Sequence, residues 1–124
     1  MITWTWRVYW LGLFVIMHLP KPPGAELTAR IGDKVVHAGA YFVLACLGGW
    51  SARRRGCRLN RRWLGRWWLI YAVYAALDEL LQAIPSLGRA CELGDWLADL
   101  TGMTAALVLL WAFGGQARNR ALAE

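Results

Sequence analysis

Two adjacent acidic residues, Asp78 and Glu79, interrupt one of the most apolar stretches of this 124-residue chain, residues 71–85. A charged side chain at the centre of a membrane helix costs about 3 kcal/mol or more, so it normally faces other helices or a water-filled cavity. At helical spacing the polar side chains of this stretch share one stripe: Tyr71, Tyr74, Asp78 and Gln82, with Glu79 beside it. The stripe predicts a polar site inside a bundle of helices.

The neighbouring apolar segments carry polar residues with the same spacing. Asp33, His37 and Tyr41 recur every four residues before and within one segment, and Asp95, Asp99 and Gly102 would share a face in another. A glycine on such a face allows helices to approach closely. We therefore predict a shared ligand-binding site formed by Asp33, Lys34, His37, Asp78, Glu79, Gln82, Arg89, Asp95 and Asp99.

Two kinds of chemistry fit these residues. Lys34, Arg89 and two helix N-termini would attract an anion. The carboxylates would pair with these cations or hold a divalent metal that bridges to a phosphate oxygen, with Asp78, Glu79, Asp95 and Asp99 as candidate ligands. General acid–base catalysis is the other use of such groups, with Asp78, Glu79 and His37 as candidate catalytic residues.

Every candidate also has a purely structural interpretation. The two aspartates at helix starts would be N-caps alone, and the adjacent acids would pair with Arg89 to lock the bundle. Gln82 would be an interhelical hydrogen bonder and His37 a satisfied interfacial histidine, while His18 has no partner in the pattern and receives no role. The number of polar groups expected on one face favours a site over these separate roles.

Four apolar segments must position this site: residues 4–19, 35–50, 67–84 and 96–113. Each is near the lower limit of the roughly 17–25 residues that span a bilayer. The nine tryptophans crowd the ends of these segments, which is typical of aromatic belts at membrane interfaces. The sequence thus predicts one all-α domain over residues 1–124, a four-helix transmembrane bundle.

The basic residues predict the orientation of this bundle. Lys and Arg exceed Asp and Glu by 14 to 8, but arginines concentrate in a loop, residues 51–66, between two membrane-length segments, which argues against nucleic-acid binding. By the positive-inside rule this loop and both termini are cytoplasmic, where the arginines would also contact anionic lipid. Nearly all acids then lie at the extracytoplasmic face. The cysteines Cys46, Cys57 and Cys91 would lie at different depths, so no disulfide is expected.

The ordered set of polar motifs resembles the VanZ-like family. The matching residues are Asp33-Lys34-x-x-His37-x-x-x-Tyr41, Asp78-Glu79-x-x-Gln82, Arg89 and Asp95-x-x-x-Asp99-x-x-Gly102. Two departures are Asp99, where the family pattern has asparagine, and Leu87-Gly88-Arg89 in place of Pro-Gly-Arg. The resemblance implies a small multi-pass protein of the bacterial inner membrane, in a family named for a member linked to teicoplanin resistance, and it brings no established reaction.

These observations predict an extracytoplasmic site that acts on an anionic lipid-linked or cell-envelope component and affects glycopeptide susceptibility. The expected partners are the lipid bilayer and either a lipid-linked cell-wall precursor or an anionic lipid head group; a homo-oligomer is also open, and no nucleic acid is expected. A divalent metal is the one cofactor that the residues suggest. The alternatives are a membrane phosphoester hydrolase or head-group transferase, a structural or assembly subunit, and a proton-coupled transporter.

Overall fold

The computed structural model describes residues 2–19, 30–87 and 91–121, and all regular structure in these ranges is helical. The helices are α1 (Ile2–Met17), α2 (Arg30–Arg54), α3 (Arg61–Gln82) and α4 (Leu93–Ala121), with a short 3-10 turn, η1, at Pro85–Leu87. No strand occurs among the described residues. The predicted all-α class and the four helices are confirmed.

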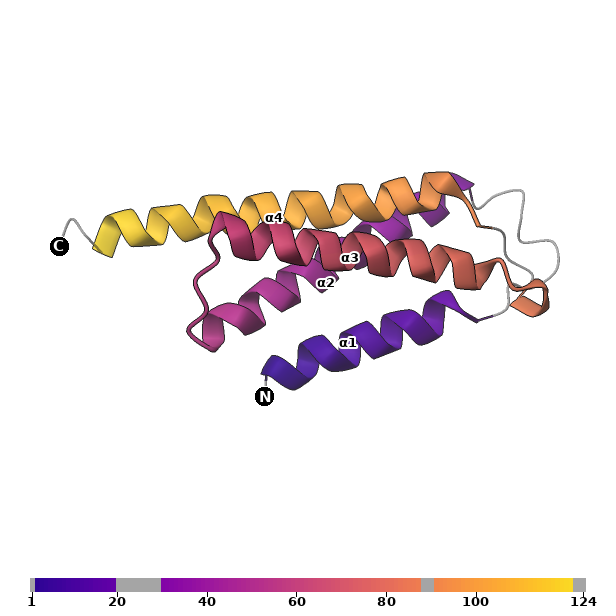
Figure 1. The fold of residues 1–124 in the computed structure, drawn as a ribbon, viewed down its shortest axis with the longest axis horizontal. Coiled ribbons are helices and arrows are strands. Elements are labelled where there is room, and N and C mark those ends of the chain that lie inside the picture. Colours follow the sequence, from indigo (N-terminus) through magenta and orange to yellow (C-terminus); the bar gives the residue numbers. More distant parts are fainter. Residues whose placement is uncertain (1, 20–29, 88–90, 122–124) are drawn as a thin grey trace.

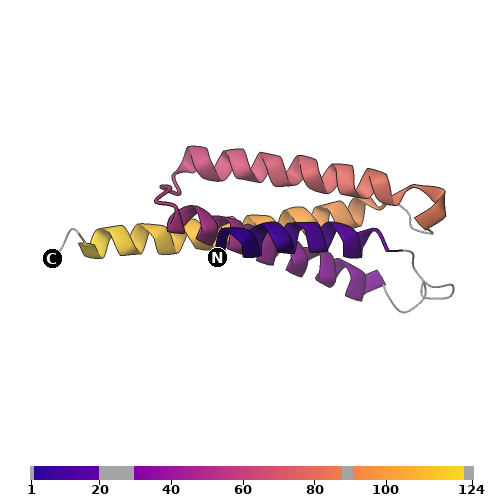
Figure 2. The ribbon, with the colours of Figure 1, turned by 90° about the horizontal axis from the view of Figure 1, so that it is seen from below.

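The four helices lie lengthwise beside one another and alternate in direction (Figures 1 and 2). The start of α1, the end of α4 and the connection from α2 to α3 lie towards one end, called the basic end here because Arg53–Arg62 lies there. The start of α2, the end of α3 and the start of α4 lie at the opposite end, called the site end. Helices α2 and α4 share the most extensive packing, although they are separated by α3 in sequence.

At the basic end, helices α2 and α3 extend beyond the apolar segments that predicted them. Helix α2 continues through Arg54 and α3 begins at Arg61, so residues 55–60 connect them instead of the expected loop 51–66. Arginine favours helix formation and therefore prolongs both helices. Asn60 begins α3 as its N-cap, because its side-chain oxygen accepts a 2.8 Å hydrogen bond from the backbone N–H of Trp63.

The predicted N-cap positions are displaced in the structure. Helix α2 begins at Arg30, so Asp33 lies within its first turn and not at its cap. Helix α4 begins at Leu93, which places Asp95 in its first turn. Both carboxylates still lie near the positive end of a helix dipole, where a negative charge is favourable.

One glycine contact brings α2 and α4 together. A Cβ atom at Gly102 would lie 2.7 Å from the carbonyl carbon of Ala38 and 2.9 Å from its Cα, both closer than van der Waals contact allows. Because these atoms belong to the backbone of α2, they cannot rotate away from a larger side chain. The predicted close approach at Gly102 is confirmed.

The distribution of polarity differs from that of a typical soluble protein, although the described core also contains twelve buried apolar residues. Large apolar side chains are exposed along all four helices, for example Val8, Val43, Val73 and Val108. In contrast, the interior contains seven buried polar or charged residues: His37, Ser51, Asp78, Glu79, Gln82, Asp95 and Asp99. Among the described helices, Gly32–Arg54 and Leu93–Phe113 are long and apolar enough to cross a membrane, which meets the expectation of four spans in part.

The tryptophans divide between exposed and partly buried positions. Trp10 of α1 packs against Tyr71 and Tyr74 of α3, with ring centroids 5.5 and 5.1 Å apart, and Trp6 packs against Trp67 at 5.6 Å. Aromatic rings at these separations attract one another beyond the effect of their buried area. This cluster joins α1 to α3, whereas the exposed tryptophans are Trp4, Trp50, Trp68 and Trp111.

Candidate functional site

A buried histidine–carboxylate pair lies at the centre of the site. His37 of α2 and Asp99 of α4 are 1% and 0% exposed, and His37 Nδ1 lies 3.0 Å from Asp99 Oδ1. Ala38 and Gly102, the residues of the close helix contact, stand one and three positions further along the same two helices. The backbone approach at the glycine therefore sets the distance that this hydrogen bond needs.

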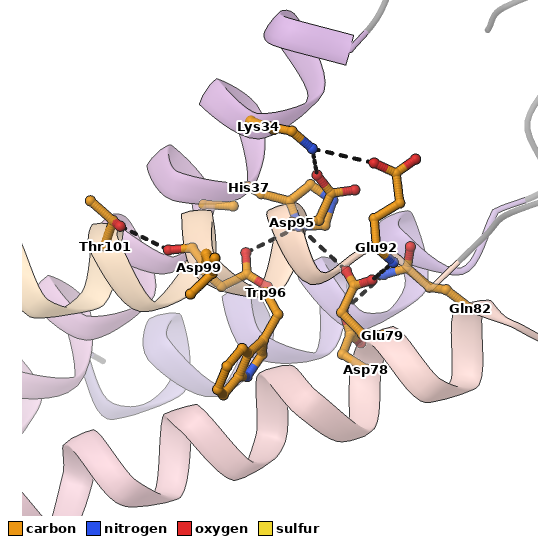
Figure 3. Close-up of polar contacts among 12 residues, drawn as sticks. Lys34, His37, Asp78, Glu79, Gln82, Glu92, Asp95, Trp96, Asp99 and Thr101 are labelled. Carbon is orange, nitrogen blue, oxygen red and sulfur yellow. Dashed lines mark hydrogen bonds and ion pairs between the residues drawn. The ribbon is translucent and has the colours of Figure 1, made fainter.

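Glu79 brings α3 into the same cluster (Figure 3). Its Oε2 atom accepts a 3.0 Å hydrogen bond from the backbone N–H of Glu92, the residue just before α4. Its Oε1 atom lies 3.9 Å from His37 Nδ1 and accepts no hydrogen bond from the described residues. Glu79 thus fixes the start of α4 with one oxygen and presents the other to the histidine.

Lys34 closes the outer side of the site (Figure 3). Its Nζ atom donates to Asp95 Oδ1 at 2.7 Å and to Glu92 Oε2 at 3.3 Å, and its side chain is 40% exposed. Gly94 leaves room for this amine, because a Cβ there would lie 2.8 Å from Nζ. Lys34 is therefore paired with two carboxylates of this chain, and it does not stand free to meet an anion.

Asp78 belongs to a neighbouring polar group that includes α1. Gln82 Nε2 donates to Asp78 Oδ2 at 3.3 Å, and His18 Nδ1 lies 3.6 Å from Asp78 Oδ1. His18 Nδ1 also lies 2.8 Å from the carbonyl oxygen of Phe14. The sequence stripe correctly places Asp78 and Gln82 in the interior, but His18, which received no role from the sequence, is a neighbour of Asp78.

The structure brings together most of the predicted site residues. Lys34, His37, Glu79, Asp95 and Asp99 form one cluster, with Asp78 and Gln82 beside it. Asp33 is half-buried in the first turn of α2, and Arg89 lies outside the described residues. Sequence reasoning missed Glu92 and His18; their positions at the ends of apolar segments on the site side were the available signal.

The described site is strongly acidic. It contains five carboxylates, those of Asp78, Glu79, Glu92, Asp95 and Asp99, against Lys34 and two histidines. Besides Glu79 Oε1, the buried Asp99 Oδ2 and the hydroxyl group of Tyr41 have no hydrogen-bond partner among the described residues. Buried polar atoms normally have partners, so these groups indicate a place for water or for a bound ligand.

Three side chains have the spacing of metal ligands. One ligand atom from each of His37, Glu79 and Asp95 lies within 4.8 Å of the other two, and all three residues are buried. Asp78 and Asp99, which the sequence also suggested as ligands, do not belong to this group within the described part of the chain. The site therefore offers one nitrogen and two oxygen donors, each from a different helix.

An apolar groove of about 330 Å³ lies between α3 and α4 near the basic end, away from this site. Its lining includes Arg61, Leu64, Trp68, Leu107 and Trp111. It contains none of the candidate site residues.

Comparison of the chain with protein-family models, with curated proteins and with solved structures finds no significant match.

Proposed function

We propose that this chain is a multi-pass protein of the bacterial inner membrane, with all four helices in the bilayer. The support is the polarity of the bundle, which exposes large apolar side chains on every helix and buries four of its carboxylates, those of Asp78, Glu79, Asp95 and Asp99. An apolar surface of this extent is costly in water and favourable in lipid. With its 16 residues, α1 is about 24 Å long, which fits a locally thin bilayer or a bundle that shields its ends.

The orientation that we propose puts the basic end and both termini in the cytoplasm. Arginines of α2, α3 and their connection gather at the basic end, and the positive-inside rule assigns such an end to the cytoplasmic side. The site end is then extracytoplasmic. His37 and Arg53 are sixteen residues apart on α2, so the two ends are separated by about 24 Å of helix.

The proposed activity follows from the site at the extracytoplasmic end. We propose a VanZ-like protein that acts on an anionic lipid-linked or cell-envelope component and thereby affects glycopeptide susceptibility. The observation that carries this proposal is the convergence of motif residues from three helices: His37, Glu79 and Asp99 meet within hydrogen-bond or ion-pair distance. A polar centre in an apolar bundle costs stability, so a working site is a better explanation than architecture.

The charges of the site constrain how an anion is met. Lys34 is engaged by Asp95 and Glu92, and the described carboxylates outnumber the cations. An anionic head group in direct contact with this surface would be repelled. The anion is therefore met through a positive charge that the described residues do not supply, such as Arg89 or a bound metal ion.

A metal-assisted phosphoester hydrolase or head-group transferase is the second candidate. The observation that favours it is the buried Asp99–His37 hydrogen bond, because a carboxylate that holds a histidine is a common way to orient an acid or base. Incubation of the purified protein with lipid phosphates and divalent metals would test this function. Release of inorganic phosphate or exchange of a head group would support it, and no turnover would exclude it.

The decisive experiment compares wild type with Glu79→Gln and Arg89→Gln in a strain that lacks the gene, at matched membrane levels, with teicoplanin susceptibility as the readout. Arg58→Gln is the matched control, because it removes an exposed arginine at the basic end. We expect the first two variants to accumulate and lose the phenotype while the control retains it. If all three behave as wild type, the polar cluster is architecture and the chain is a structural subunit.

A further inference from the structure

We propose that His37, Glu79 and Asp95 bind one divalent transition-metal ion of the Zn²⁺ or Mn²⁺ class. The ligand atoms of these residues lie within 4.8 Å of one another. Donors at about 2.0–2.6 Å from a common metal ion are at most about 4–5 Å apart. The three side chains therefore need only small movements to share one ion. The part that this ion plays with an anionic component rests on the proposed function, but the binding itself does not.

An orphaned oxygen is the second observation that points to a ligand. Glu79 is 2% exposed, and its Oε1 atom faces His37 without accepting a hydrogen bond from the described residues. A buried carboxylate oxygen without a donor is costly, and a metal ion satisfies it directly. Glu79 Oε2 is held by the backbone N–H of Glu92, so the free oxygen is kept in place for binding.

Asp99 completes the arrangement as a positioning residue. Its Oδ1 atom lies 3.0 Å from His37 Nδ1, and both side chains are fully buried. Metal-bound histidines usually donate their other ring N–H to a carboxylate, which fixes the tautomer and the ring. With the proton on Nδ1, Nε2 is the ring atom left to bind the ion, so Glu79 Oε1, which lies 3.9 Å from Nδ1, would have to approach Nε2 instead.

The donor set selects the class of ion. One imidazole and two carboxylates suit Zn²⁺, Mn²⁺ or Fe²⁺, whereas Mg²⁺ and Ca²⁺ prefer oxygen ligands alone. Three protein ligands also leave coordination positions for water or for an oxygen of an anionic ligand. Such an ion would supply the positive charge that an anionic head group requires at this site.

Lys34 would compete with the metal ion for Asp95, and this competition provides an independent test of the metal site. Its Nζ atom lies 2.7 Å from Asp95 Oδ1, where a positive charge competes with a metal for the same carboxylate. Lys34→Gln removes that charge and none of the three ligands. We therefore expect this variant to bind the ion more tightly than wild type.

The experiment titrates Mn²⁺ alone into the purified full chain in detergent, after removal of bound metal with a chelator. Electron paramagnetic resonance follows the loss of the free-ion signal, and Zn²⁺ is then added as a competitor. We expect saturable binding of about one ion per chain, displaced by Zn²⁺. Mn²⁺ is chosen because it binds weakly to thiols, so the exposed Cys57 and Cys91 do not contribute.

Variants assign the binding to these residues. We expect Glu79→Gln and Asp95→Asn to weaken Mn²⁺ binding by about tenfold or more, and Lys34→Gln to strengthen it. Arg58→Gln is the control, since it changes an exposed residue at the basic end and none of the three ligands, and it should bind as wild type. Circular dichroism verifies that each variant is helical.

Two results would overturn the metal site: no saturable Mn²⁺ or Zn²⁺ binding by wild type, or unchanged affinity in both ligand variants. A Lys34→Gln variant that binds no more tightly than wild type would also count against the geometry, and it does so without removing a ligand. These outcomes are separate from the antibiotic experiment. Mn²⁺ binding with an unaltered Glu79→Gln phenotype refutes the proposed function alone, and absence of binding with a lost phenotype refutes the metal alone.

Discussion

Replacement of Gly102 by alanine tests the contact on which the whole site depends. A Cβ there would meet the backbone of Ala38 at 2.7 and 2.9 Å, where ordinary contact begins at 3.4 Å. Backbone atoms cannot rotate aside, so α2 and α4 must separate by an amount on the order of 1 Å. The hydrogen bond from His37 to Asp99, 3.0 Å long and one turn away, would then exceed hydrogen-bond reach.

Two destabilising effects and one stabilising effect determine how much Gly102→Ala changes the free energy of unfolding. Overpacking costs about 1–3 kcal/mol, and loss of a buried hydrogen bond to a charged group costs about 1.5–3 kcal/mol. The two costs overlap, because the separation that relieves the clash is the one that breaks the bond. Alanine in place of glycine returns up to about 1 kcal/mol through helix propensity. The net expectation for Gly102→Ala is a loss of about 1–3 kcal/mol in the free energy of unfolding.

The measurement is reversible unfolding of the purified protein in mixed micelles, followed by tryptophan fluorescence. Gly39→Ala is the matched control, because Gly39 is exposed on α2 and a Cβ there would have nothing within 4 Å. The control should be unchanged or more stable by up to about 1 kcal/mol. If Gly102→Ala is as stable as Gly39→Ala, the two helices do not approach as closely as described and the reasoning is refuted.

Two further predictions concern the basic end and the topology. Asn60→Ala should lower the free energy of unfolding by about 1 kcal/mol, because it removes the side chain that caps the N-terminus of α3. Asn60→Ser keeps a capping oxygen and should retain most of the wild-type stability. Equal stability of the two variants in the same unfolding assay would contradict the cap. The topology can be tested in single-cysteine variants with a membrane-impermeant maleimide, because the thiols of Cys57 and Cys91 are both exposed in the bundle. The reagent should label Cys91 in right-side-out vesicles and Cys57 in inside-out vesicles. Labelling of both cysteines from the same side would refute the proposed topology.

The helical class could be predicted from the sequence because apolar segments of membrane length have few other solutions. The helix bounds could not be predicted in the same way, because arginine is polar on a hydropathy scale and yet favours helix formation. This is why α2 runs through Arg54 and α3 begins at Arg61, well inside the expected loop. The Asn60 cap was visible in the sequence as an asparagine before a helix, and it marks the boundary better than hydropathy does.

The stripes of the site could also be predicted, because helical periodicity alone determines which residues share a face. Buried Asp78, Glu79 and Gln82 confirm the stripe on α3. Pairings across helices could not be predicted, because they depend on how the helices cross and how far each side chain reaches. Lys34 was expected to meet an anion, yet it pairs with Asp95 and Glu92, and His18 acquires a neighbour in Asp78 only when α1 packs beside α3.

The close contact between α2 and α4 at Gly102 and the proposed metal site depend on each other. Three carboxylates of α3 and α4, those of Glu79, Asp95 and Asp99, are buried beside a single histidine, and such a group repels itself unless it takes up protons or holds a positive charge. Lys34 reaches only the outer side of the cluster, at Asp95. An ion bound by His37, Glu79 and Asp95 would lie among three helices and would link them, because each helix supplies one ligand. Such a link requires α2 and α4 to be near enough for their side chains to meet at one point, and the missing side chain at Gly102 permits that approach.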